Sequence, residues 1–209
     1  MTVPLRGTLI AIEGIDGTGK TTLQHALAKE WRARGFRVLE LREPSQGPTG
    51  RRARRASGLD PWTAAMAFTE DRRHQRSRLD RALRRGNVVV LDRSFYSTLA
   101  YQGSALPVAQ RRTLERLQHD ATIVPDRVIL LDLPVEASQA RMERRGSARD
   151  PTEHHEVLRR ASRAYHQLAR RFGWMVLDAR RTRAELLRQV DRRLTPWVLR
   201  RSGPRRGRT

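Results

Sequence analysis

The sequence predicts an α/β fold in which about five parallel strands alternate with helices. Five short apolar runs rich in β-branched residues indicate strands at residues 8–12, 37–41, 87–91, 127–131 and 174–177. Segments long enough for helices separate these runs, and strands that alternate with helices form a parallel sheet. The 209 residues suit one domain, which we place at residues 1–199, and the basic segment 200–209 is expected to be a disordered tail.

The first strand run leads directly into a phosphate-binding sequence. Residues 14–21 match the pattern G-x-x-x-x-G-K-[ST], with Gly14, Gly19, Lys20 and Thr21 at the required positions. Glycines let the backbone curl so that its N–H groups point at phosphate oxygens, while the lysine neutralises phosphate charge and the threonine hydroxyl ligates Mg²⁺. The pattern therefore predicts a P-loop NTPase-type fold with a bound nucleotide. The residues expected around its phosphates are Gly14, Asp16, Gly17, Thr18, Gly19, Lys20, Thr21 and Thr22.

Helical segments fit between the strand runs. The spacing of apolar residues predicts helices at 22–31, 61–85, 108–119 and 135–145, and prolines stand at the start of the last three. Helix-breaking residues at 146–151 interrupt the chain, and we interpret residues 144–152 as a short lid. Ligands of a parallel sheet bind at the carboxyl ends of its strands. The polar residues at or just beyond those ends are Asp16, Arg42, Asp92 and Asp132.

The composition is strongly basic. The net charge is +21, and 41 of the 43 basic residues are arginine. Such a charge suggests nucleic acid as a partner, but the arginines are spread through every helix and aromatic residues make up only 5% of the chain, too few for an obvious base-stacking surface. We therefore expect a solvated arginine-rich surface with non-specific nucleic-acid affinity. The chain has no long apolar run or signal-peptide pattern, so a cytoplasmic protein without a membrane span is expected. The absence of cysteine excludes disulfides and thiolate metal ligands.

Four further segments resemble the thymidylate kinases, which phosphorylate dTMP with ATP. They follow the phosphate loop in the order typical of that family and span nearly the whole chain. They are Arg42-Glu43-Pro44, then residues 68–72 (Phe-Thr-Glu-Asp-Arg), then Asp92-Arg93 with residues 97–103, and finally Pro125-Asp126 leading to residues 131–134. The resemblance implies ATP and Mg²⁺ as cofactors, and a homodimer.

The resemblance also implies a role for each of several residues. Arg42 and Arg93 would grip the acceptor phosphate, since arginine forks suit phosphate geometry, and Arg54 is a further candidate. Around the acceptor base, the resemblance implies stacking by Phe68, a base-edge hydrogen bond from Arg72, and contacts from Thr98 and Gln102. In similar enzymes the carboxylate at Asp16 contacts the sugar hydroxyl of the acceptor. Thr21 and Asp92 are the expected Mg²⁺ contacts, with orientation of Arg93 as the alternative role for Asp92, and Glu13 is either a helper or structural.

Transfer of a phosphoryl group depends on in-line positioning and on cations that balance the charge of the transferring group. Some thymidylate kinases carry an arginine in the phosphate loop, but this loop has none. The catalytic residues expected are therefore Lys20, Arg93 and an arginine of the lid. Arg149 best matches the arginine in the family's lid sequence, Arg145 is the fallback, and Arg144 is close by.

The chain departs from the family near the acceptor and the lid. Ser45 and Gln46 replace two glycines of the Arg-Glu-Pro-Gly-Gly-Thr segment, so that loop should follow a different path, and Ser94 replaces an aromatic residue, for which Phe95 and Tyr96 would compensate. Three functions stay open: a dTMP kinase, a kinase for another pyrimidine monophosphate such as dUMP, a 5-modified dUMP or CMP, and a non-catalytic nucleotide-dependent regulatory or nucleic-acid-binding module. A screen of nucleoside monophosphates with MgATP separates them.

Overall fold

The computed structural model describes residues 7–146 and 151–202, and of residues 151–154 it describes only the backbone. Its core is one five-stranded parallel sheet in the order β2-β3-β1-β4-β5. The strands are β1 (Thr8–Glu13), β2 (Val38–Arg42), β3 (Val88–Asp92), β4 (Arg127–Asp132) and β5 (Met175–Asp178). Each predicted strand is present within one residue of its expected bounds, because a strand buried on both faces is a nearly continuous apolar run.

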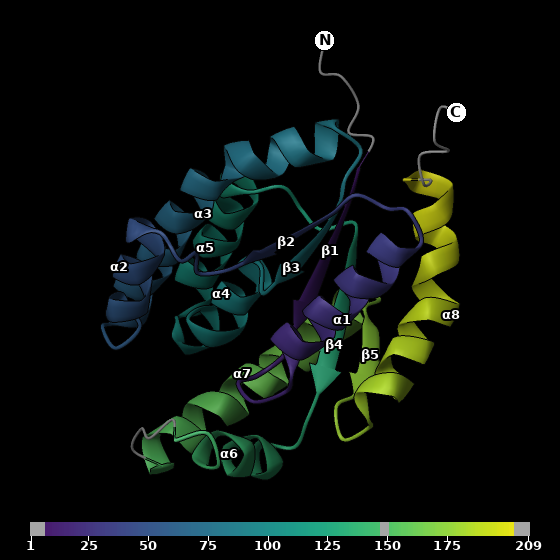
Figure 1. The fold of residues 1–209 in the computed structure, drawn as a ribbon. Coiled ribbons are helices and arrows are strands. Elements are labelled where there is room, and N and C mark those ends of the chain that lie inside the picture. The colour runs from purple at the N-terminus through teal and green to yellow at the C-terminus, as the bar shows by residue number, and fades with distance from the viewer. Residues whose placement is uncertain (1–6, 147–150, 203–209) are drawn as a thin grey trace.

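Helices cover both faces of the sheet (Figure 1). They are α1 (Lys20–Ala33), α2 (Pro48–Ala56), α3 (Pro61–Arg84), α4 (Phe95–Tyr101), α5 (Val108–Ala121), α6 (Val135–Glu143), α7 (Pro151–Phe172) and α8 (Arg183–Arg201), with a 3₁₀ turn at Gly103–Ala105. Helices α1 and α8 pack on one face, and α3, α4, α5 and α7 pack on the other. None of the helices in the described part of the chain is long and apolar enough to cross a membrane.

The two faces of the sheet follow the alternation of side chains along each strand. Ile10 and Ile12 of β1 pack among residues of α1 and α8, whereas Ala11 between them packs on the opposite side, against α3 and α4. On the α1 side, the indole of Trp31 is fully buried and donates a hydrogen bond to the Thr195 hydroxyl of α8 at 3.0 Å. Helix α8 is thereby held against α1.

The last helix, α8, extends two residues beyond the predicted domain end at residue 199. Helix α8 begins at a capping box between Thr182 and Glu185 and continues through Arg201, so Arg200 and Arg201 form its last turn rather than the start of a tail. The Ser202 hydroxyl lies 2.6 Å from the Thr8 hydroxyl of β1 and fixes the helix end to the sheet. Residues 203–209 of the expected tail lie outside the described residues. The breaker segment 146–151 does separate two helices, α6 and α7, as expected.

Candidate active site

The loop between β1 and α1 has the backbone shape that its glycines predict. Gly14 has φ of +142°, and a Cβ there would lie 2.5 Å from the Leu131 carbonyl oxygen of β4, so only glycine fits. Gly17 has φ of +74°, and a Cβ there would lie 2.8 Å from the Ser138 carbonyl oxygen of α6. Ser138 also donates from its hydroxyl to the Asp16 carbonyl at 2.5 Å. The loop is therefore held between β4 and α6 at the carboxyl end of the sheet.

Lys20 is folded back into this loop. Its Nζ donates to the Ile15 carbonyl at 2.7 Å and to the Gly14 carbonyl at 3.0 Å, and the side chain is buried. Burial, together with the charge of Arg93, lowers the pKa of Lys20 to about 8. The ammonium thus lies within the phosphate loop and has carbonyl oxygens of the loop as its partners.

Two oxygen-bearing side chains meet beside the start of α1. The Thr21 hydroxyl donates to Asp92 Oδ2 at 2.5 Å, which joins the phosphate loop to the end of β3. A hydroxyl and a carboxylate are ligands that suit Mg²⁺, which is commonly held by one or two protein oxygens, phosphate oxygens and water. In the described part of the chain no group of three or more His, Cys, Asp or Glu side chains gathers as a metal cage. The residues present therefore fit a Mg²⁺ ion that is shared with nucleotide phosphates.

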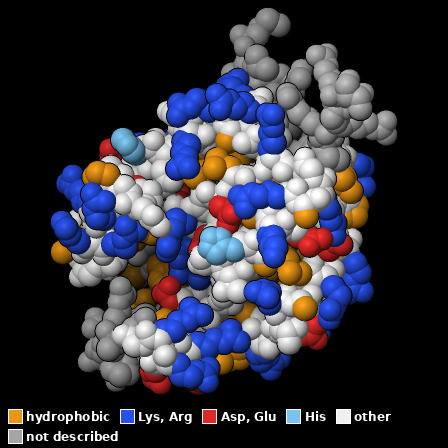
Figure 2. Space-filling view, viewed as in Figure 1, with side chains coloured by type: hydrophobic (Ala, Val, Ile, Leu, Met, Phe, Trp, Pro, Cys, Tyr) orange, Lys and Arg blue, Asp and Glu red, His pale blue; other side chains and the backbone are white. Residues whose placement is uncertain are grey.

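A cavity of about 300 Å³ opens next to the phosphate loop. Its walls come from the loop after β2, from α2 and α3, and from α4 with the segment that precedes it. Figure 2 shows the visible face hollowed between the region of α2 and that of α6 and α7, beneath a surface on which basic side chains far outnumber acidic ones. All seven residues predicted to bind the acceptor line this cavity, and Arg54 lines it as well. The seven are Asp16, Arg42, Phe68, Arg72, Arg93, Thr98 and Gln102.

An ion pair joins the phosphate loop to the cavity. Arg93 Nη2 lies 2.6 Å from Asp16 Oδ1, and the Tyr101 hydroxyl of α4 donates to Asp16 Oδ2 at 3.2 Å. Burial alone would raise the pKa of Asp16, but the charges of Arg93 and Lys20 outweigh it and hold the pKa well below its usual value. Arg93 has φ of +67°, an unfavourable conformation for a residue with a side chain, and strain of this kind occurs often at active sites.

Comparison with known proteins agrees with this geometry. The sequence profile named "Thymidylate kinase" matches residues 12–190 of the chain. The chain is 40% identical over 198 residues to the thymidylate kinase of Xanthomonas euvesicatoria pv. vesicatoria, covering 91% of this chain and 85% of that protein. It is 38% identical over 197 residues to the thymidylate kinase of Xanthomonas campestris pv. campestris, with the same coverage, and 34% identical over 186 residues to the probable thymidylate kinase of Pyrobaculum aerophilum, covering 87% and 93%.

The chain belongs to the thymidylate kinase family. It is accordingly an ATP-dependent phosphotransferase, a nucleoside monophosphate kinase whose acceptor is dTMP. The resemblance seen in the sequence motifs is confirmed over most of the chain.

A buried carboxylate, Glu13, is connected to Arg93 through the hydroxyls of Ser97 and Tyr165. Glu13, at the end of β1, is fully buried and accepts hydrogen bonds from the Ser94 and Ser97 hydroxyls at 2.6 and 2.7 Å and from the Tyr165 hydroxyl at 3.0 Å. Burial raises the pKa of Glu13, although these hydrogen bonds oppose the shift. Arg93 Nη1 in turn donates to the Ser97 and Tyr165 hydroxyls at 3.1 and 3.3 Å. The network fixes the arginine from α4 and from α7.

No pattern in the sequence pointed to Tyr165, which lies within α7 and outside every motif. Tyr101 and Ser97 lie inside a recognised segment, but their contacts with Asp16 and Glu13 depend on where α4 sits. Phe95 and Tyr96 do not compensate for Ser94 at the acceptor. They pack with each other in the core, while Ser94 caps α4 by accepting from the Tyr96 N–H at 3.3 Å.

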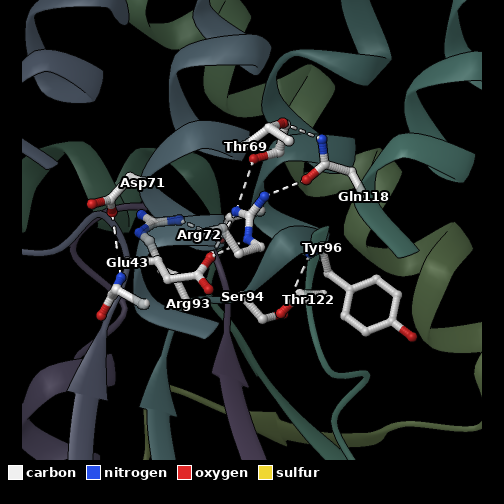
Figure 3. Close-up of polar contacts among 12 residues, drawn as sticks. Glu43, Thr69, Asp71, Arg72, Arg93, Ser94, Tyr96, Gln118 and Thr122 are labelled. Atoms are coloured by element: carbon white, nitrogen blue, oxygen red, sulfur yellow. Dashed lines mark hydrogen bonds and ion pairs between the residues drawn. The ribbon is translucent and has the colours of Figure 1, made fainter. Parts of the chain in front are cut away.

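Arg72 on α3 is held by other side chains of the protein. Figure 3 shows its guanidinium between Glu43 and Gln118, with Gln118 reaching on to Thr69. Its Nη2 lies 2.6 Å from Glu43 Oε2 and donates to the Thr98 hydroxyl at 3.2 Å, its Nε donates to Glu43 at 2.8 Å, and its Nη1 donates to Gln118. Of the five N–H groups of an arginine, one on Nη1 is left for a ligand. The base-edge hydrogen bond predicted for Arg72 is therefore limited to a single donor.

The loop that departs from the family is tied down by Asp71. This buried carboxylate accepts from the Ser45 N–H at 2.7 Å, from the Ser45 hydroxyl at 2.5 Å and from the Thr49 hydroxyl at 2.7 Å. The Ser45 hydroxyl also accepts from the Gly47 N–H at 3.3 Å. Neither Ser45 nor Gln46 has a positive φ, so the loop avoids the strain that side chains in place of glycines would otherwise meet.

A second cavity, of about 360 Å³, lies on the other side of the phosphate loop. Five arginines line it, from α6 and the residues just after it, from the segment between β5 and α8, and from the start of α8, and none of the described residues in its lining is acidic. The five arginines are Arg141, Arg144, Arg145, Arg181 and Arg183. Arg141 joins the two sides, because it donates to the Gly17 carbonyl at 3.4 Å and to the Ala179 carbonyl at 3.0 Å. Arg145 is exposed at the end of α6, whereas Arg149 lies outside the described residues.

Proposed function

We propose that this thymidylate kinase transfers the γ-phosphoryl group of MgATP to the 5′-phosphate of dTMP, with ATP on the arginine-lined side of the phosphate loop and dTMP in the 300 Å³ cavity. The observation that carries this assignment is the ion pair between Asp16 and Arg93. Asp16 belongs to the loop that holds the donor, and Arg93 lines the cavity for the acceptor. A direct contact between the two sites is what alignment of two reacting nucleotides requires.

On the donor side, the backbone N–H groups of residues 14–22 cradle the phosphates and Lys20 neutralises their charge. Thr21 and Asp92 would hold Mg²⁺, which balances phosphate charge when bound. In the hydrogen bond between Thr21 and Asp92 the hydroxyl and the carboxylate point at each other, so both can contact one ion placed between them. Asp92 thus has the role of a Mg²⁺ contact rather than a partner of Arg93.

On the acceptor side, Arg93 and Arg42 grip the phosphate, and Arg54 stands near them. Arg42 and Arg54 are exposed, so their side chains can reorient toward a phosphate. Arg54 would give up its hydrogen bond from Nη1 to the Pro44 carbonyl, at 3.2 Å, to do so. Phe68 supplies the stacking face for the base, while Arg72, Thr98 and Gln102 contact its edge. Asp16 accepts a hydrogen bond from the sugar hydroxyl while its charge remains balanced by Arg93.

The lid supplies the remaining cation. The phosphate loop carries no arginine, so Arg149, with Arg145 as the alternative, would close over the phosphates and balance the charge that spreads over the transferring group. Closure of the lid also excludes water, which limits hydrolysis of ATP. Lys20 and Arg93 complete the set of cations around the transferred phosphoryl group.

Three wider properties are part of the proposal. On the basis of the family, the protein is cytoplasmic and forms a homodimer. Sedimentation of the purified protein tests the dimer. Its net charge of +21 gives it non-specific nucleic-acid affinity. That affinity should fall steeply with salt and be independent of nucleotide sequence.

Formation of ADP from MgATP in the presence of each nucleoside monophosphate tests the acceptor. We expect turnover with dTMP well above that with dUMP, 5-modified dUMP or CMP. Preferential use of CMP would contradict the assignment of the base pocket, and no turnover with any acceptor would contradict the kinase itself.

Replacement of Arg93 by alanine tests the junction between the two sites. We expect acceptor use, measured as kcat/KM for dTMP, to fall far more than the affinity for ATP, because Arg93 lines the acceptor cavity. Arg112→Ala, which removes an exposed arginine of α5 outside both cavities, is the matched control. Equal losses for the two nucleotides would count against the acceptor role of Arg93.

A further inference from the structure

A third concave site lies outside the two nucleotide cavities. It is a groove of about 410 Å³ between α5 and α7, with Leu99 of α4 in its lining. Four arginines line it: Arg111 from α5, and Arg160, Arg163 and Arg171 from α7. Its volume falls within the usual range of small-molecule sites.

The positive charge of this groove is only partly balanced. Glu115 is the acidic residue in its lining, and it pairs with Arg171 at 2.9 Å. Arg160 has a distant partner in Glu156, at 3.8 Å, and the structure gives Arg111 and Arg163 no ion pair with any described residue. Three of the four guanidinium groups therefore have most of their hydrogen-bond donors available for an anion.

Arg160 gives a second, independent indication of a ligand. Its Nε is buried and has no hydrogen-bond partner among the residues that the structure describes. A buried donor without a partner is unfavourable, and such an atom in a native protein is a place to look for a bound ion or water. The unsatisfied donor belongs to one of the arginines that line the groove.

The placement of the available arginines suits a ligand with several phosphate groups in a row. Arg160 and Arg163 follow each other along α7, and Arg111 lines the groove from α5. The groove thus offers guanidinium groups from two helices. None of the described residues that line the groove is aromatic, so this part of the chain offers it no stacking face for a nucleobase.

We propose that the groove between α5 and α7 binds a linear oligophosphate, either free or as the tail of a nucleotide. Arginine is well suited to this ligand, because its planar fork pairs with phosphate oxygens in a bidentate manner. The site is separate from the acceptor cavity. Arg163 and Gln167 project from the side of α7 that lies away from Tyr165, which faces the active site.

Titration calorimetry with inorganic tripolyphosphate tests the proposal. Saturating MgADP and dTMP fill both nucleotide sites without a reaction, so binding that remains must occur elsewhere. We expect one tripolyphosphate to bind per chain under these conditions. Loss of binding when the nucleotide sites are filled would place tripolyphosphate in the active site and overturn the proposal, whatever the outcome of the kinase assay.

Substitution of two arginines localises the site. Arg160→Gln with Arg163→Gln should weaken tripolyphosphate binding by roughly tenfold or more, since each substitution removes a guanidinium group that can form charge-assisted hydrogen bonds with phosphate. The control, Arg112→Gln with Arg192→Gln, removes the same charge from exposed residues outside the groove. An equal loss in the control would mean that net charge alone attracts the anion, and the proposal would fail.

Two competitors identify the source of the oligophosphate. Displacement of tripolyphosphate by dTTP under the same conditions supports the tail of a nucleotide as ligand, and tripolyphosphate that binds without displacement by dTTP supports the free chain. A single-stranded oligothymidylate is the second competitor. If it binds the groove more tightly than tripolyphosphate does and displaces it, the proposal is overturned in favour of nucleic acid.

Discussion

The acceptor cavity and the proposed ATP cavity differ in how many of their arginines are paired. In the acceptor cavity, Arg72 is buried and paired with Glu43, and Arg93 is largely buried and paired with Asp16, while Arg42 and Arg54 are exposed. In the proposed ATP cavity, Arg144 and Arg145 are exposed just beyond the end of α6, and no described residue of the lining is acidic. The acceptor cavity is thus partly organised by ion pairs without its nucleotide, whereas we expect the arginines of the ATP cavity to pair with the phosphates of ATP.

This difference fits the two tasks of the enzyme, recognition of the acceptor base and transfer of the phosphoryl group. A base must be told apart from similar bases, so its pocket needs fixed donors whose positions do not depend on the ligand. The transferring phosphoryl group needs cations at the moment of reaction, and a segment that closes over it can provide them while excluding water. Substitutions on the donor side should therefore lower kcat, and substitutions in the acceptor cavity should raise KM or change selectivity.

The lid arginine should give the largest effect. We expect Arg149→Ala to lower kcat by about 10³-fold with little change in the affinity for either nucleotide, because the arginine balances charge mainly in the transition state. Arg149→Lys should recover only part of the loss, since an ammonium lacks the two-pronged grip. Single-turnover transfer in Arg149→Ala, Arg145→Ala and the double variant measures this effect. A double variant as fast as the parent would show that the lid carries no catalytic arginine.

Lys20 should follow. We expect Lys20→Ala to lower kcat by on the order of 10²-fold or more while the protein remains folded. Thermal unfolding of the variant is the control. We expect little change in stability, because the hydrogen bonds of Lys20 go to oxygens of the phosphate loop and because burial disfavours its charged form, as its lowered pKa indicates. Near-normal kcat would remove the phosphate loop from the mechanism.

Phe68 and Arg72 test the acceptor side. Phe68→Ala should raise the KM for dTMP, because loss of a stacking face costs about 1–3 kcal/mol. Arg72→Ala should reduce discrimination between thymine and cytosine nucleotides, and it should also destabilise the fold because Glu43 is left buried without its partner. Equal use of thymine and cytosine nucleotides by the unmodified protein would contradict the selectivity of this pocket.

Proton uptake on ATP binding is a smaller effect that reports the donor side alone. Because burial lowers the pKa of Lys20 to about 8 in the free protein, much of the side chain is neutral at pH 8.5, and the phosphates of ATP should restore its proton. We expect uptake of up to about one proton at pH 8.5 and none at pH 6.5, so affinity should fall as pH rises above 8. Calorimetry in buffers of different ionisation enthalpy measures the uptake, and Lys20→Met should abolish it.

Ser45 should give the smallest effect. Ser45→Ala removes the hydroxyl that joins Asp71 and the Gly47 N–H, and we expect a loss of about 1 kcal/mol in the free energy of unfolding, since the Ser45 N–H still reaches Asp71. Chemical denaturation of the variant measures this change. An unchanged stability together with a raised KM for dTMP would show that the hydroxyl serves the acceptor rather than the loop.

Local sequence determined the strands and the phosphate loop. A buried parallel strand is an apolar run, and the phosphate loop needs glycine at Gly14 because the backbone there has φ of +142°, so both leave a signal within a few neighbouring residues. The resemblance to the family, rather than any local pattern, predicted the seven acceptor residues, which are spread over 87 residues from Asp16 to Gln102, and the fold brings them to one cavity.

Only the tertiary structure decided how those residues are paired. The contacts of Glu13 with Tyr165 and of Arg72 with Gln118 join residues that are 152 and 46 positions apart, and no local pattern specifies such partners. The same holds for the groove between α5 and α7, whose arginines look like any others among the 41 in the sequence. Hydrogen bonds and charge balance depend on distance in space. That distance is fixed by how the helices pack on the sheet, not by the order of residues along the chain.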